Sequence, residues 1–63
     1  MISIEEMKRC KGKRIRIFFE DAKPIEGVCL YFLYPEEDDE ENMLELEGYL
    51  INQSEIERIE IID

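Results

Sequence analysis

The chain has 63 residues, a formal net charge of -9 and 44% hydrophobic residues. This apolar content argues against disorder, and the length fits one small domain whose limited core would gain from association with another chain. No apolar run reaches the roughly 18 residues that span a bilayer, and the first residues lack the order of a signal peptide. We therefore expect a cytoplasmic protein with no membrane partner.

The N-terminal residues predict a short helix over about residues 3–11. Ser3 and Glu6 have the spacing of a capping box, and Ile2 and Met7 occupy the positions of a hydrophobic staple around it. Acids fall in the first turn and bases in the last, as the helix dipole favours. Gly12 follows where such a helix would end.

Five short strands are predicted after the helix. From Arg14 the apolar residues alternate, with Ile15, Ile17 and Phe19 on one face. The stretch 25–34 is apolar on both faces, as in a strand that bends around a core or lies under a partner, and Gly27 would allow the bend. Residues 43–53 indicate two short strands around a glycine, and residues 54–63 indicate a last strand.

Catalytic chemistry finds little support in the composition. The chain has no histidine, which removes the commonest general base and the commonest zinc ligand. Cys10 and Cys29 lack CxxC spacing and are expected to be reduced thiols, and Ser54 is expected to be a turn residue. We expect no enzyme activity, no cofactor and no metal site.

The order of elements, with these landmarks, resembles the Sm-like (LSm) family, although an SH3-like barrel of different ancestry would share many of them. The first family motif is matched at Gly12, Ile15, Ile17, Asp21 and Gly27, and the second at Ile51, Ile56 and Ile59. The resemblance implies a mostly β fold: an N-terminal α-helix followed by a strongly bent five-stranded antiparallel small barrel, about residues 14–62 of a single domain over residues 1–63.

The same resemblance implies a ring of identical subunits. In Sm-like rings the fourth strand of one subunit pairs with the fifth strand of the next, which hides sheet edges that would otherwise be adhesive. The expected interface residues are Tyr49, Ile51, Ile59 and Ile61. If the fourth strand is an interface, Ile51→Lys is expected to break the ring into monomers.

The RNA-contacting positions of the family are where this chain departs from it. Sm proteins hold uridine with an aspartate and an asparagine near the third strand and an arginine followed by glycine in the second motif. Here Asn42 can supply the amide, but Asn52 and Gln53 replace the arginine and glycine. The cation is missing at that position.

A basic run between the helix and the first strand is the alternative RNA-binding feature. It carries six bases and no acid: Lys8, Arg9, Lys11, Lys13, Arg14 and Arg16. Phosphate binding needs such a cluster on one face. Against it, the net charge repels a polyanion, and neutralisation of the acidic half within or between subunits explains the run equally well.

The acidic run Glu36–Glu41 has four interpretations: a metal site, a solvated loop, a contact with a basic protein and part of a nucleic-acid mimic. Six consecutive acids without glycine point in diverging directions, unlike the ligands of a calcium loop. We expect a solvated loop that protects a sheet edge from aggregation, with a contact to a basic protein surface as the alternative. A nucleic-acid mimic would require this run and five further acids to form one negative face: Glu45, Glu47, Glu55, Glu57 and Glu60.

These observations predict a non-enzymatic Sm-like binding or adaptor module that self-assembles through strand edges and binds protein. An RNA-binding Sm-like ring that uses the basic run is the second hypothesis. An acidic nucleic-acid mimic is the third.

Overall fold

The computed structural model describes residues 1–62. Their elements follow in the order α1 (Ile4–Arg9), β1 (Arg14–Phe18), β2 (Ile25–Leu33), β3 (Met43–Leu46), β4 (Tyr49–Asn52), the 3-10 helix η1 (Gln53–Glu55) and β5 (Arg58–Ile61). The prediction of a mostly β chain with a short N-terminal helix and five strands is confirmed.

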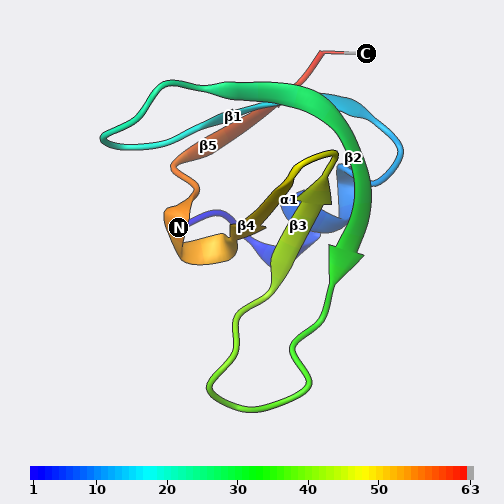
Figure 1. The fold of residues 1–63 in the computed structure, drawn as a ribbon, viewed down its shortest axis with the longest axis vertical. Coiled ribbons are helices and arrows are strands. Elements are labelled where there is room, and N and C mark those ends of the chain that lie inside the picture. The colour runs from blue at the N-terminus through cyan, green and yellow to red at the C-terminus, as the bar shows by residue number, and fades with distance from the viewer. Residues whose placement is uncertain (63) are drawn as a thin grey trace.

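The strands form one antiparallel sheet in the order β4-β3-β2-β1-β5. β2 is the longest strand and arches over the molecule, so that its first half pairs with β1 and its second half with β3 (Figure 1). Consequently β4 and β5 are the two outer strands of the sheet, each paired on one side only.

The helix is capped as predicted but is shorter than predicted. The Ser3 hydroxyl accepts a hydrogen bond from the Glu6 N–H at 3.1 Å, which satisfies one free donor of the first turn. The expected end at Lys11 is wrong, because α1 ends at Arg9 and continues as a turn to Gly12 with φ +79°. The Gly12 N–H donates to the Cys29 carbonyl at 2.8 Å, so the chain leaves the helix early to join β2.

The core lies between α1 and the concave side of the sheet. Alternation in β1 buries Ile15 and Ile17 completely, as predicted, and the staple residues Ile2 and Met7 are also buried. The remaining buried residues are Cys10, Cys29, Leu44, Leu46, Ile51 and Ile56. Among residues 1–62, no helix has the length and apolar character needed to cross a membrane.

The bend of β2 involves two positions. The pairing with β3 is irregular between Cys29 and Tyr31, so a bulge lies near Leu30. Gly27 lies closer to the start of the strand, where an added Cβ would stand 3.4 Å from the Leu46 side chain. The glycine therefore leaves room for the end of β3 on the concave side of β2.

Both cysteines are reduced and buried, as the prediction of free thiols requires. Burial raises the pKa of the Cys10 thiol to about 11, with the neighbouring Cys29 as a second cause, and burial also raises the pKa of Cys29. A thiolate is therefore disfavoured at both positions in the folded protein.

We expect both thiols to resist an aromatic disulfide reagent in the native protein and to react when urea unfolds it. A Lys23→Cys variant, with an exposed thiol, is the reactive control, and fast labelling of the native wild-type would contradict the prediction.

The raised pKa of Cys10 also makes stability depend on pH. Because the folded pKa of Cys10 lies above the ordinary value of 9.0, the contribution of this thiol to stability is complete below pH 9.0 and is lost as pH rises toward about 11. Urea unfolding followed by circular dichroism at rising pH measures this loss.

Candidate functional site

The outer edge of β4 presents free main-chain groups. The Gln53 N–H donates to the Asn42 carbonyl at 2.9 Å, in the register that continues the β3–β4 ladder. Bonded and non-bonded pairs alternate in an antiparallel ladder, so Leu50 and Asn52 direct their N–H and C=O groups away from β3. An added strand would pair with these two residues.

The side chains of β4 divide between the core and the surface. Tyr49 and Leu50 are 50% and 59% exposed, whereas Ile51 is only 4% exposed and belongs to the hydrophobic core of the chain. The proposed use of Ile51→Lys as an assembly test is therefore wrong, because a lysine there would disrupt the fold first. The main-chain groups of Ile51 face Leu44 of β3, so only the exposed neighbours of Ile51 remain available to an interface.

One of the two free donors on this edge is already occupied. The Glu55 carboxylate, from η1, accepts a hydrogen bond from the Asn52 N–H at 3.1 Å. The contact satisfies a donor at the start of η1 and also caps the β4 edge at this residue. Of the two outward N–H groups, that of Leu50 is the one left free to pair with an added strand.

The outer edge of β5 is similarly open. The Ile62 N–H donates to the Arg14 carbonyl at 2.9 Å, so by the same alternation Ile59 and Ile61 direct their main-chain groups away from β1. The Ile61 side chain is 47% exposed, and that of Ile59 packs partly against the core. Both outer strands thus combine unpaired main-chain groups with apolar side chains.

The residues aligned with the uridine-binding positions come together but bond to one another. The Asn42 amide donates to the Gln53 side-chain oxygen at 3.3 Å, and the Gln53 amide donates to the Ile2 carbonyl at 2.8 Å. The Asn42 amide, which was predicted to contact a base, therefore joins the start of β3 to η1, and the Gln53 amide joins η1 to the N-terminus. Asn52 lies at the end of β4, with its N–H on Glu55.

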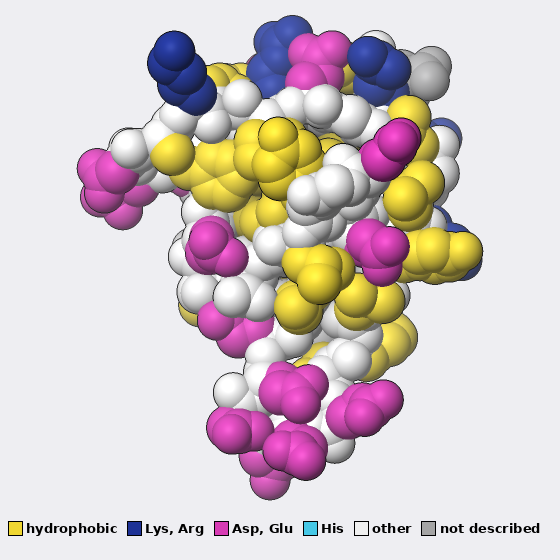
Figure 2. Space-filling model, viewed as in Figure 1, with side chains coloured by type: hydrophobic (Ala, Val, Ile, Leu, Met, Phe, Trp, Pro, Cys, Tyr) yellow, Lys and Arg dark blue, Asp and Glu magenta, His cyan; other side chains and the backbone are white. Residues whose placement is uncertain are grey.

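The acidic loop, Glu36–Glu41, is exposed along its whole length, as predicted for a solvated loop. Figure 2 shows its carboxylates gathered at one end of the molecule, with arginine and lysine side chains at the opposite end. One residue has a structural contact that the sequence did not indicate. The Glu41 carboxylate accepts hydrogen bonds from the N–H and hydroxyl of Ser54 at 2.8 and 2.9 Å, which ties the loop to η1.

The basic run is divided by the structure into two parts. Arg14 and Arg16 lie on β1 and pair with Glu26 of β2, the Arg16–Glu26 contact being 2.8 Å. Arg16 also approaches Glu60 of β5 at 3.9 Å, and Arg58 binds the same carboxylate at 2.9 Å. These exposed pairs neutralise the strand part of the run.

Hydrogen bonding from Arg16 is the main reason that the pKa of Glu26 is lowered from its ordinary value, and Arg14 adds to the effect. The Glu60 carboxylate lies between the guanidinium groups of Arg16 and Arg58 and is neutralised in the same way. A continuous unneutralised acidic face, as a nucleic-acid mimic needs, therefore does not extend to Glu60.

The helix part of the run lies against tyrosines. The Lys8 ammonium stands 5.3 Å from the centre of the Tyr34 ring, and the Lys11 ammonium stands 5.9 Å from the centre of the Tyr31 ring. Tyr34 raises the pKa of Lys8, so the lysine remains charged. Both tyrosines are more than half exposed. Arg9 and Lys13 lie nearby on the exposed surface.

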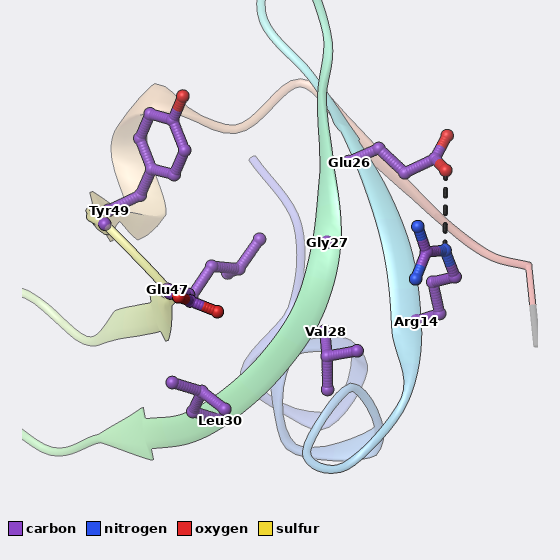
Figure 3. A pocket seen from close by; sticks show the side chains of 9 residues that line it. Arg14, Glu26, Gly27, Val28, Leu30, Glu47 and Tyr49 are labelled. Atoms are coloured by element: carbon purple, nitrogen blue, oxygen red, sulfur yellow. Dashed lines mark ion pairs between the residues drawn. The ribbon is translucent and has the colours of Figure 1, made fainter.

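A groove of about 690 Å³ lies between the bend of β2 and the β3–β4 turn. Val28, Leu30 and Tyr49 line it with exposed apolar surface, and Leu46 and Gly27 also contribute to its wall. Figure 3 shows Tyr49 and Glu47 across the groove from β2. This groove was not predicted from the sequence, although the stretch 25–34, apolar on both faces, was the feature that could have indicated it.

The described residues, 1–62, contain no group of three or more Cys, Asp or Glu side chains arranged to hold a metal ion. Comparison of the chain with models of protein families, with curated proteins and with solved structures finds no match.

Proposed function

We propose that the chain is a non-enzymatic Sm-like binding or adaptor module that assembles with copies of itself through β4 and β5 and binds protein. The helix-first order and the strand order β4-β3-β2-β1-β5 support a strongly bent small barrel of this type. The observation that carries the proposal is the pair of open edges at opposite ends of one sheet, each flanked by exposed apolar side chains.

Open edges are adhesive unless they are protected, and these two have little protection. Arg58 and Glu60 are charged residues of β5, but they form an ion pair on one face of the sheet and therefore do little to protect the edge. Pairing β4 of one subunit with β5 of the next would satisfy the free groups of Leu50, Ile59 and Ile61 and cover apolar surface. Such head-to-tail contacts close into a ring when the rotation permits.

The test is the mass in solution of a Leu50→Pro variant. The Leu50 N–H points away from β3, so proline removes an edge donor without removing a ladder bond, and edge strands tolerate proline in that orientation. We expect wild-type oligomers and variant monomers of unchanged circular dichroism in sedimentation experiments. An assembly of unchanged mass in the variant, or a monomeric wild-type, would reject self-assembly through β4.

Removing the Glu55 carboxylate is expected to strengthen assembly. In Glu55→Ala the Asn52 N–H becomes free for a neighbouring carbonyl, and one hydrogen bond at about 1 kcal/mol corresponds to a roughly fivefold higher association constant. Glu57→Ala is the matched control, since it removes an exposed acid of the same segment. Sedimentation at several protein concentrations measures the constants. Equal gains in both variants would show that net charge, not the edge donor, is responsible.

RNA binding is the second candidate, favoured by the exposed surface on which Lys8 and Lys11 lie over Tyr34 and Tyr31. Bases stack on aromatic rings and phosphates attract ammonium groups, so this surface offers both contacts. Anisotropy of labelled oligo-uridine and oligo-adenine at low salt tests it. Salt-dependent binding that Lys8→Ala and Lys11→Ala abolish would establish RNA as a ligand, and the proposal for protein binding expects none.

A further inference from the structure

We propose that the groove between β2 and the β3–β4 turn binds a short basic and apolar segment of a partner protein. The groove residues are Arg14, Glu26, Gly27, Val28, Leu30, Leu46, Glu47, Gly48 and Tyr49. This inference rests on the proposed protein-binding function and names the chemistry of the partner.

The apolar walls of the groove are exposed in the isolated subunit. Val28 and Leu30 are 42% and 41% exposed on β2, and Tyr49, at the start of β4, is 50% exposed and lines the same groove (Figure 3). Leu50 extends the apolar surface across β4. A volume of about 690 Å³ accommodates several side chains of a partner and falls in the usual range of binding sites. Burial of these residues would favour an apolar anchor.

The charges around the groove select the partner. Arg14 and Glu26 line the groove beside Val28 and form an ion pair at 3.5 Å, and Arg16 binds the same carboxylate at 2.8 Å, so Glu26 is neutralised. Among the described residues, Glu45 and Glu47, beside β4, have no ion pair with lysine or arginine. The unneutralised charge on the rim is therefore negative. A lysine or arginine adjacent to the apolar anchor would be attracted to it, and the phosphates of a nucleic acid would be repelled.

A second copy of the chain fits this rim less well. The segment that would reach it through strand pairing, residues 55–62, contains three acids and one base. The basic residues of a second copy lie on α1, β1 and β5 and in the turns before and after β1, and Arg14, Arg16 and Arg58 already bind carboxylates. The net charge of -9 on a second copy also opposes its docking on an acidic rim. The groove therefore favours a different, basic protein, while Leu50 and the β5 edge remain available for self-assembly.

Two short peptides test the charge selection: one in which leucine and lysine alternate, and one with glutamate in place of each lysine. Amide shifts of the isotopically labelled protein report binding. We expect saturable shifts at Val28, Leu30, Gly48 and Tyr49 with the lysine peptide, and binding of the glutamate peptide weakened about tenfold or more. No saturable shift at these residues, or equal binding of both peptides, overturns the inference.

A pair of charge reversals localises the contact. Glu47→Lys is expected to weaken binding of the lysine peptide about tenfold, and Glu57→Lys, which changes net charge equally but lies outside the groove, less than about twofold. Equal losses in the two variants overturn the assignment of the site. Circular dichroism of both variants confirms that they remain folded, as expected for exposed positions.

Sedimentation of the same samples separates this inference from the proposed self-assembly. Binding of the lysine peptide to monomeric Leu50→Pro, with the same groove shifts, supports the groove independently of assembly. Dissociation of wild-type oligomers in step with peptide binding would show that another copy fills the groove, and would overturn the choice of a basic partner. Assembly without peptide binding would leave only the strand-edge proposal standing.

Discussion

Ile51→Lys is expected to unfold the domain. Ile51 is 4% exposed and packs in the core with Leu44 and Ile56. The substitution loses the burial of an isoleucine, about 1.5–3 kcal/mol, and places an ammonium group where no carboxylate is buried with it. The core of a domain this small rarely supplies more than about 3–5 kcal/mol of net stability, so the two losses together remove most or all of it.

Leu50→Lys is the control, because the adjacent side chain is 59% exposed on the other face of β4. We expect this variant to retain the circular dichroism and the urea midpoint of the wild-type within about 0.5 kcal/mol. The Ile51 variant should show the spectrum of an unfolded chain without denaturant. A folded, monomeric Ile51→Lys protein would instead place this side chain in an interface, as the resemblance first implied.

The elements of this fold were predictable where one local pattern decides the outcome. Ser3 and Glu6 define the helix start through a contact three residues apart, and alternation of Ile15 and Ile17 defines the inner face of β1. Gly48, with φ +83°, forms the turn that the two short strands on either side of it require. In each case the relevant partner is adjacent in sequence or repeats with a fixed period.

The features that were missed depend on residues far apart in the chain. Glu41 binds Ser54 and Gln53 binds the Ile2 carbonyl, and no local pattern indicates either partner. The same limit applies to the end of α1, which the long-range bond between Gly12 and Cys29 determines. The candidate site is affected most, because a groove exists only after β2 has bent toward the β3–β4 turn.

Met7→Ala is expected to cost about 2–5 kcal/mol of unfolding free energy, the range for truncating a fully buried large side chain. Met7 is 0% exposed and is the buried residue of α1, whereas Ile4, on the same helix, is 38% exposed. Ile4→Ala is therefore the matched control, with an expected loss below about 1 kcal/mol. Urea unfolding of both variants measures the difference, and similar losses would mean that Met7 does not anchor the helix.

Truncating Met7 is expected to loosen α1 from the sheet as well as to weaken the core. A helix of six residues is far too short to be stable alone, so α1 persists because Met7 and its neighbours dock it on the sheet. When the anchor is removed, Lys8 and Lys11 are expected to leave the rings of Tyr34 and Tyr31 before the sheet unfolds. Hydrogen exchange should then show α1 amides exchanging faster than those of β1 and β2 in Met7→Ala. Because the groove lies on β2 and the β3–β4 turn, its binding of the lysine peptide should survive in any variant molecules whose sheet is intact.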